Sequence, residues 1–279
     1  MKKHLPTIVL VLIFCIGLSL LLYPTVSDYW NSLHQSCAIS NYADAVAALD
    51  NEDYDRILES ARNYTQNLAK NGTSWNLTEE QKEEYEKQLC VDDTGIMSYI
   101  EIPSIDCSLP IYHGTDEGVL QKAIGHIPGS SLPVGGKSTH CVLSGHRGLP
   151  SAKLFTDLDQ LKEGETFLLR TLDETLTYQV DQILIVEPNE LQALQIEEGE
   201  DLCTLVTCTP YGVNSHRLLV RGHRIANQAD ASYVRVTADA VQIDPVLVAP
   251  VVGVPILIIL LIGLLARTRK KERNRGECR

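Results

Sequence analysis

Two long apolar runs stand near the ends of the chain. Residues 5–23 and 246–266 contain no charged residue, whereas the stretch between them is strongly polar. As helices rising about 1.5 Å per residue, these runs would be roughly 28 and 31 Å long, which is enough to cross a bilayer core. The pattern therefore predicts a membrane segment within residues 1–23 and a transmembrane helix at 246–266.

The first run also fits a secretory signal peptide, because Lys2 and Lys3 precede an apolar stretch. The residues around Tyr23 offer no small-x-small cleavage site, which favours an uncleaved anchor. Basic residues flank both runs on the side of the chain ends, at Lys2 and Lys3 and throughout the tail 267–279. By the positive-inside rule, both termini should be cytoplasmic and residues 24–245 should lie outside the cell membrane.

Residues 24–94 are predicted to form a helical arm. From residue 40 to about residue 71, apolar side chains recur at helical spacing without Gly or Pro. Asn71 and Gly72 should end this helix, and the capping-box pattern from Thr78 to Gln81 should open a second helix that reaches about residue 89. We expect the two helices to form a hairpin.

The pattern changes after Gly95 to short runs rich in β-branched residues, separated by Pro and Gly. These runs occupy 96–102, 107–112, 139–144, 166–171, 176–186, 202–207 and 218–222. Seven or eight short strands predict a mostly β fold, either a barrel or a sandwich, over residues 95–226. One short helix or turn is expected at 154–161, and residues 227–245 should link the β domain to the second membrane run.

Charge and cysteine spacing exclude several classes of protein. The net charge is −12, and the terminal flanks contribute +2 and +5, so the outer region carries −12 − 7 = −19. Such an acidic region argues against nucleic-acid binding. The eight cysteines form no CxxC pair and no zinc-ligand pattern, so no metal or other cofactor is predicted. A disulfide between Cys37 and Cys90, which bracket the helical hairpin, is conceivable, although spacing does not determine connectivity.

Cys208 is the best candidate for a nucleophile. It follows the apolar run 202–207 and precedes Pro210, so it should stand at a strand end beside a loop, where side chains meet substrate. Cys203 lies five residues earlier and should point to the opposite face of the same strand. The competing interpretation is that Cys208 is a small buried apolar residue.

A reactive thiol needs a neighbouring cation or base, since a thiol with an ordinary pKa of about 8.5 is mostly protonated at neutral pH. Arg217 lies nine residues after Cys208, across a loop that can return the chain beside its own strand. His146 lies where the run 139–144 gives way to a tight loop. Spacing alone leaves other candidates open: His113, His126, His140, His216, His223, Arg147, Arg221 and Arg224.

The segment TLVTCTPYGVNSHRLLVRG at 204–222 closely resembles the TLxTC-to-arginine signature of sortases, and LSGHRGLPSAKLF at 143–155 resembles their histidine segment. The similarity continues through YIEIPSIDCSLPIYHGT, GSSLPVGGKSTH and LLYPTVSDYWN. The similarity covers most of the chain, and the chain most resembles class C, the pilus-assembling sortases. The resemblance implies an eight-stranded sortase-type β-barrel at 95–226, with His146, Cys208 and Arg217 as the catalytic residues.

The same resemblance implies the reaction. The Cys208 thiolate would attack the Thr–Gly bond of an LPxTG-like sorting signal, and the thioacyl enzyme would pass to a lysine amine of the next pilin subunit on the surface of a Gram-positive-type bacterium. The alternative enzyme would transfer the protein to a peptidoglycan precursor or mainly hydrolyse it. A third alternative is an inert membrane-tethered scaffold in which Cys208 is structural.

One feature departs from class C enzymes, which usually carry an Asp-Pro-aromatic lid over the catalytic cysteine. No Asp-Pro occurs between Trp30 and Gly95. Trp75, in the turn between the two predicted helices, is a candidate substitute for the lid. The alternative is an ordinary, partly buried tryptophan in a hairpin loop.

Overall fold

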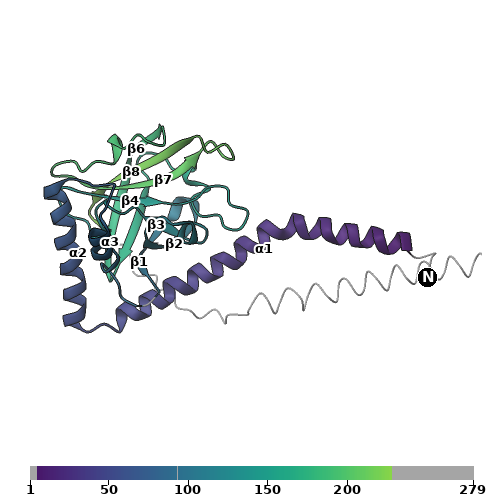
Figure 1. Cartoon of the computed structure of the whole chain (residues 1–279), viewed down its shortest axis with the longest axis horizontal. Helices are drawn as coiled ribbons and strands as arrows, with labels where there is room; N and C mark the ends of the chain where they lie inside the picture. Colours follow the sequence, from purple (N-terminus) through teal and green to yellow (C-terminus); the bar gives the residue numbers. More distant parts are fainter. Residues whose placement is uncertain (1–4, 93, 228–279) are drawn as a thin grey trace, which may run out of the picture. The chain divides into compact units, whose positions relative to one another are not determined.

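The computed structural model describes residues 5–92 and 94–227, all within a compact unit of residues 1–233 (Figure 1). The predicted transmembrane helix at 246–266 and the basic tail 267–279 lie outside the described residues. The same is true of the linker 227–245 except for Asn227.

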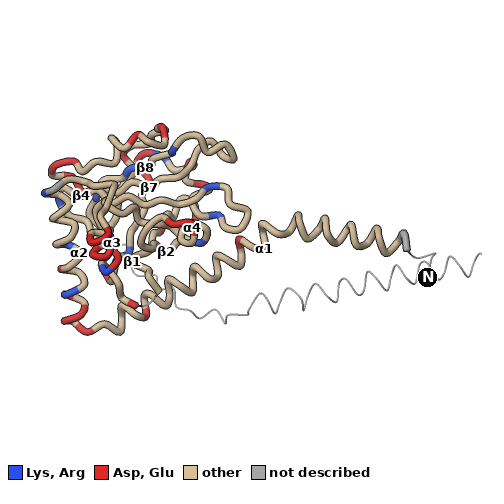
Figure 2. The backbone as a smooth tube through the Cα atoms, in the orientation of Figure 1, with Lys and Arg blue, Asp and Glu red and all other residues tan. Residues whose placement is uncertain are grey.

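The first apolar run belongs to a long helix, α1 (Leu5–Ala47), that continues through Pro24 into the arm. It is the one helix among the described residues that is long and apolar enough to cross a membrane, and its most apolar 18 residues are entirely unburied. Figure 2 shows no charged residue along this apolar part of α1. A signal sequence or membrane anchor at the N-terminus is therefore present, as predicted.

The prediction of one continuous helix from residue 40 to residue 71 was wrong. Helix α1 ends at Ala47, and α2 (Asn51–Asn71) begins after Asp50, whose carboxylate accepts a hydrogen bond from the Asp53 amide at 2.8 Å. An N-cap aspartate satisfies an amide that has no partner within the helix, so it favours a helix start at this point. The polar run from Asp50 to Asp53 carried this signal within a stretch whose apolar spacing looked continuous.

The second arm helix, α3 (Glu79–Glu86), opens with the predicted capping box. The Gln81 amide donates to the Thr78 hydroxyl at 3.3 Å, and the Thr78 amide donates to the Gln81 side chain at 2.9 Å. The helix ends three residues earlier than expected. Helices α2 and α3 form the predicted hairpin: the Tyr64 and Tyr85 rings lie 6.4 Å apart, and Ser60 donates to the Gln88 side chain just after α3 at 2.9 Å.

All seven predicted strands form, and together with an eighth they close a barrel in the order β1-β2-β3-β4-β7-β8-β6-β5. The strands are β1 (Ile96–Ile102), β2 (Cys107–His113), β3 (Ile124–His126), β4 (Thr139–Ser144), β5 (Thr166–Thr171), β6 (Glu174–Val186), β7 (Asp201–Thr209) and β8 (His216–Ile225). The pairs β2–β3 and β4–β7 are parallel and the others antiparallel.

The missed strand, β3, has only three residues, which is too short for an alternating pattern to be recognised. Three 3₁₀ turns and a single helical turn connect the strands: η1 (Pro103–Ile105), α4 (Glu117–Leu120), η2 (Leu158–Gln160) and η3 (Gln192–Leu194). The helix or turn expected at 154–161 is thus one 3₁₀ turn.

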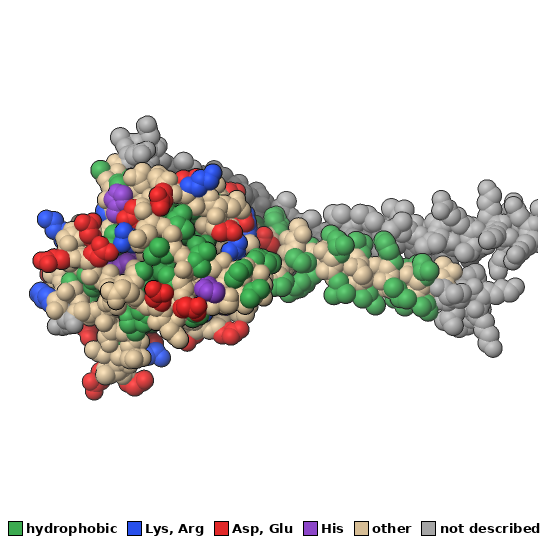
Figure 3. All heavy atoms as spheres, turned by 90° about the horizontal axis from the view of Figure 1, so that it is seen from above, with side chains coloured by type: hydrophobic (Ala, Val, Ile, Leu, Met, Phe, Trp, Pro, Cys, Tyr) green, Lys and Arg blue, Asp and Glu red, His purple; other side chains and the backbone are tan. Residues whose placement is uncertain are grey.

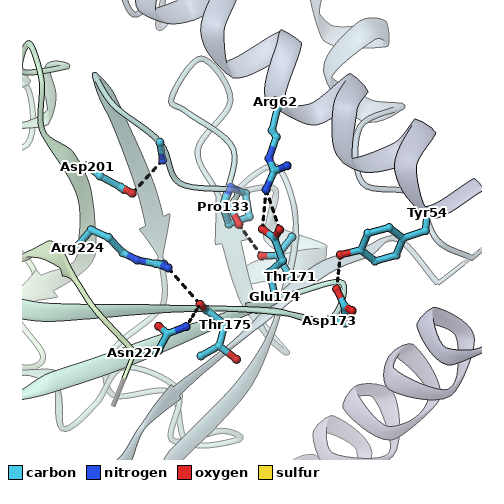
Figure 4. Close-up of polar contacts among 11 residues, drawn as sticks. Tyr54, Arg62, Pro133, Thr171, Asp173, Glu174, Thr175, Asp201, Arg224 and Asn227 are labelled. Atoms are coloured by element: carbon cyan, nitrogen blue, oxygen red, sulfur yellow. Dashed lines mark hydrogen bonds and ion pairs between the residues drawn. The ribbon is translucent and has the colours of Figure 1, made fainter. Parts of the chain in front are cut away.

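The arm is bound to the barrel by polar contacts at the β5–β6 turn (Figure 4). Arg62 of α2 pairs with Glu174 at 2.7 Å, and the Tyr54 hydroxyl donates to Asp173. The buried Tyr42 hydroxyl of α1 donates to the Met97 carbonyl at 3.1 Å and accepts from the Leu172 amide at 2.8 Å. These contacts join arm and barrel into one unit.

Candidate active site

The site is built on three neighbouring strands, β4, β7 and β8 (Figure 1). Cys208 is the second-to-last residue of β7, and its antiparallel partner on β8 is Arg217. In the parallel ladder between β4 and β7, Ser144 is the partner of Val206. His146 follows Ser144 by two residues and Cys208 follows Val206 by two, so β4 and β7 bring both residues to the same end of the barrel, where Arg217 is paired with Cys208.

Two hydrogen bonds hold the chain at this level where β4 ends. The Gly145 amide donates to the Val206 carbonyl at 3.0 Å, and the Thr207 hydroxyl donates to the Gly145 carbonyl at 2.7 Å. They extend the β4–β7 pairing past the last residue of the strand. The His146 segment therefore leaves the sheet at the end of β7 that carries Cys208.

The alternation of side chains along β7 separates two faces. Cys203 and Leu205 point into the barrel core, whereas Val206 belongs to a separate apolar cluster with Val142 and Leu219. Cys208 lies two residues from Val206 on β7, and Arg217 lies two residues from Leu219 on β8, and side chains two residues apart on a strand point to the same face. Cys208 and Arg217 therefore share the face that carries this second cluster, and the His146 segment leaves β4 at the same end.

Cys208, His146 and Arg217 are each partly exposed. The Arg217 guanidinium donates to the carbonyls of Asn214 at 3.3 Å and His216 at 3.1 Å. Within the described part of the chain, neither the Cys208 thiol nor the His146 ring makes a hydrogen bond. A thiol, an imidazole and a guanidinium on one open face are suited to acyl transfer through a thioester.

A family model for the sortase domain matches residues 100–225. The crystal structure of sortase C1 from Streptococcus agalactiae is 55% identical, with a TM-score of 0.67, and the match covers 68% of this chain and 99% of that one. This chain belongs to the sortase family. Sortase C from Streptococcus pneumoniae is 44% identical, with a TM-score of 0.62 and coverage of 69% and 98%. The sequence-based resemblance to class C is confirmed.

Curated relatives match over a shorter part of their length. Sortase D of Bacillus subtilis is 31% identical over 137 residues, which are 48% of this chain and 66% of that protein. Sortase A of Bacillus anthracis is 27% identical over 50% of this chain and 64% of its own length. Sortases are membrane-anchored extracellular cysteine transpeptidases, in agreement with the apolar helix α1.

The remaining histidine candidates of the sortase have other surroundings. His126 and His140 are fully buried, and their rings bond the Ser131 and Gln195 carbonyls at 2.8 Å. His113 bonds the Gln88 carbonyl at 2.7 Å, and burial lowers its pKa. His216 lies 3.3 Å from Glu187, and His223 lies 3.8 Å from Asp181. His146 follows the last β4–β7 pair by two residues, and His216 is the β8 partner of Thr209, the residue after Cys208.

The other outer cysteines are poorly placed for catalysis. Cys141 and Cys203 are direct partners in the β4–β7 ladder, and both are buried in the barrel core. Burial raises the pKa of Cys203 and brings that of Cys107 to about 12, so both thiols stay protonated near neutral pH. No disulfide joins Cys37 to Cys90, because the Cys90 thiol donates to the Glu86 carbonyl at 3.0 Å.

Trp75 packs against the apolar cluster on the face that carries Cys208. Its segment is held closely: a Cβ added to Gly129 would lie 1.9 Å from the Ser74 carbonyl oxygen, and Thr73 donates to Gln195 at 2.9 Å. The indole Nε1 is buried without a hydrogen-bond partner.

The residues that complete this cluster could not be found from sequence. Ile127, Ala193 and Leu194 come from loops far apart in the chain, and nothing in their spacing links them to Cys208.

No group of three or more metal-ligating side chains occurs in the described ranges 5–92 and 94–227.

Proposed function

We propose that this sortase polymerises pilin subunits, with Cys208 as nucleophile, His146 as acid and base, and Arg217 as the donor to the oxyanion. The observation that carries the proposal is that Cys208 and Arg217 are paired on β7 and β8 beside an apolar surface, and that the His146 segment follows the end of the neighbouring strand β4. The similarity to two streptococcal C-type sortases supports the pilin class, since the description of the pneumococcal enzyme names pilin substrate specificity.

In the first half-reaction, the Cys208 thiolate attacks the carbonyl carbon of the threonine in an LPxTG-like signal. A tetrahedral intermediate forms and collapses as the C–N bond to glycine breaks. His146, as imidazolium, donates its proton to the departing amine, and a thioester remains on Cys208.

In the second half-reaction, a lysine amine of another pilin attacks the thioester. Neutral His146 accepts a proton from this amine, and the thiolate of Cys208 leaves as the isopeptide bond forms. One histidine thus returns to its starting state after each cycle, and no external cofactor is needed for the proton balance.

Arg217 would donate to the negative oxygen of both tetrahedral intermediates. At rest its guanidinium faces carbonyl groups of its own loop, at Asn214 and His216. These are weak, partly exposed contacts, so a developing oxyanion can compete for the same donors. A single donor of this kind typically contributes about 3 to 4 kcal/mol to transition-state stabilisation.

The rest of the predicted organisation fits this activity. Helix α1 would remain as an uncleaved anchor, and the segment 246–266 would form a second one, which leaves the arm at 24–94 and the barrel at 95–226 outside the cell. Both termini would then be cytoplasmic. Tethering of the enzyme to the bilayer would keep it near growing polymers at the cell surface.

Trp75 would act as the lid in place of an Asp-Pro-aromatic anchor. It covers the apolar cluster that continues from Cys208 along β7, where the apolar side chains of a sorting signal would bind. The indole nitrogen of Trp75 is buried without a hydrogen-bond partner, so the closed position is less stable than one in which this nitrogen is hydrogen-bonded. Such a position suits a segment that must move aside.

The test is incubation of the outer region with a purified pilin that carries an LPxTG-like signal. Covalent ladders on denaturing gels support a polymerase, and they should disappear in Cys208→Ala but persist in Cys203→Ala. Cleaved monomer without ladders would favour hydrolysis, and transfer to a peptidoglycan-type amine would favour wall anchoring. A substrate adduct on Cys208→Ala, seen by intact-mass analysis, would contradict the assignment of the nucleophile.

A further inference from the structure

Helix α1 is joined to the catalytic end of the barrel just after its apolar part ends. Ser27 and Asn31 donate to the Ser151 carbonyl at 3.3 and 2.6 Å, and the Lys153 amide donates to the Asp28 carboxylate at 2.6 Å. Ser151 and Lys153 belong to the β4–β5 loop, which begins with the His146 segment. The helix thus holds the active-site loop directly.

The residues of α1 at this joint have the composition of a membrane interface. Asp28 is the first charged residue after Lys3, and Tyr23, Tyr29 and Trp30 surround it in sequence. Tyrosine and tryptophan gather at the level of the lipid headgroups in membrane helices. Ser27 lies only about 6 Å along the helix axis from Tyr23, so the bound β4–β5 loop lies at headgroup level if α1 spans the bilayer.

The β7–β8 loop contacts the β4–β5 loop and carries exposed apolar side chains. Gly148 has φ +76°, and a Cβ at this position would lie 2.7 Å from the Tyr211 ring. The Arg147 guanidinium lies 6.0 Å from the centre of the same ring. Tyr211 is 61% exposed and Val213 is 70% exposed.

The β7–β8 loop combines two exposed apolar side chains with an uncharged sequence. Of the large apolar side chains described in the barrel, four are exposed, and two of them are Tyr211 and Val213. Residues 209–215 contain no charge, in an outer region that is otherwise strongly acidic. Figure 3 shows the contrast between the apolar surface of α1 and the mixed, charged surface of the barrel.

We propose that the β7–β8 loop inserts Tyr211 and Val213 into the lipid headgroup interface, so that the catalytic end of the barrel rests on the bilayer. The inference depends on the proposed retention of α1 as an anchor. The lipid surface is the occupant that the structure favours, because the helix that holds this end of the barrel is itself the membrane-compatible segment. An uncharged loop in an acidic domain makes the contact apolar rather than electrostatic.

A consequence concerns the substrate. Cys208 lies three residues before Tyr211, so its thiol would open close to the membrane surface. A peptide substrate tethered to the same bilayer would then meet the thiol more often than the same peptide free in solution. The preference should weaken when the loop loses its apolar side chains.

Depth-dependent fluorescence quenching tests the contact. The full chain is placed in phosphatidylcholine nanodiscs with or without bromine on the upper acyl chain, and Val213→Trp is compared with Glu198→Trp. Glu198 is exposed and lies just before β7, whereas Val213 lies beyond its other end, and the strand between them is about 26 Å long at roughly 3.3 Å per residue, so Glu198 is a matched control. The added emission at 213 should be quenched by about half, whereas that at 198 should be nearly unchanged.

Native Trp30 separates this inference from the anchoring on which it rests. Quenching of Trp30 without quenching at 213 would overturn the loop contact and leave the anchor intact. Absence of quenching at Trp30 would overturn both. If the fluorescence of the tryptophan at position 213 changes with protein concentration and not with bromine, the loop contacts a second copy of the chain. That result would also overturn the proposal.

A kinetic comparison completes the test. The double substitution Tyr211→Ser with Val213→Ser should lower turnover of a bilayer-tethered peptide by about threefold to tenfold, since apolar interfacial anchors set the depth of the loop. Turnover of the soluble peptide should stay within about twofold of the wild-type value, since the loop contact with lipid does not act on a substrate free in solution. An equal loss on both peptides would show a structural role for these residues and contradict the membrane contact.

Discussion

At the scale of single residues, the site depends on side-chain parity more than on distance along the chain. Cys203 and Cys208 belong to the same strand, yet one is fully buried in the core and the other is partly exposed on the opposite face. The sequence predicted this difference because a spacing of five reverses the side of the strand. It did not select His146 among six histidines until the family motif was considered.

Arg217→Lys should reduce kcat/KM by about two to three orders of magnitude, because a lysine ammonium cannot reproduce the planar fork at a developing oxyanion. Arg221→Lys is the matched control on the same strand, since its guanidinium is engaged with Asp181 at 3.0 Å and Glu197 at 2.8 Å. Steady-state kinetics with a sorting-signal peptide measure both. Equal values for the two variants would remove Arg217 from the catalytic assignment.

At the scale of elements, the turn between α2 and α3 reaches the surface that the three strands present. This contact was not predictable, because Trp75 meets side chains from the β6–β7 loop and from the end of β3 that are distant in sequence. The capping box of α3, by contrast, was predictable from four consecutive residues, since both of its hydrogen bonds are local. Local bonds follow from sequence, whereas contacts between loops require the fold.

Trp75→Ala should accelerate alkylation of Cys208, because removal of the indole uncovers the apolar surface beside the thiol. Reaction of the native protein with iodoacetamide, followed by peptide mass analysis, gives the rate for each cysteine. Cys107 serves as an internal reference, since its pKa of about 12 keeps it unreactive in both proteins. An unchanged rate at Cys208 would argue for an ordinary loop tryptophan and against a lid.

At the scale of the whole molecule, the barrel was largely predictable. Seven of its strands are apolar runs bounded by Gly, Pro or polar turns, and each formed close to its expected limits. The division of the arm at Asp50 and the three-residue strand β3 were missed, because one apolar pattern looked continuous and the other was too short. The closure of the sheet depends on pairs between strands remote in sequence, such as the parallel pair β4–β7 and the antiparallel pair β1–β5, which spacing does not reveal.

Stability should fall on acidification from pH 7.5 to pH 5.5. Burial lowers the pKa of His113 and His140 below the ordinary value of about 6.5, so the unfolded chain binds more protons than the folded one in this range. The two neutral histidines stabilise the fold fully at pH values above the pKa that they have in the unfolded chain. This stabilisation is lost as the pH falls from that value toward their lower pKa in the folded protein. Thermal unfolding of the outer region should show a decrease of a few degrees in Tm.

The variant His140→Gln provides the control for this pH dependence. It should be less stable at neutral pH, because the ring bonds to Gln195 and Thr204 are lost, but its Tm should vary less with pH. A Tm profile parallel to that of the wild type would show that His140 does not contribute to the acid sensitivity.

The parallel pairing of β4 with β7 also determines which parts of this protein can vary. His146 and Cys208 are 62 positions apart in the chain, but a ladder of adjacent backbone hydrogen bonds sets their distance in space. The residues between them, including the turn at Gly164 and the β6–β7 loop, form a crossover connection. The length of this connection does not affect the distance between His146 and Cys208. In evolutionary terms, the loops that recognise a substrate can lengthen, shorten or be exchanged while the reacting groups keep their positions.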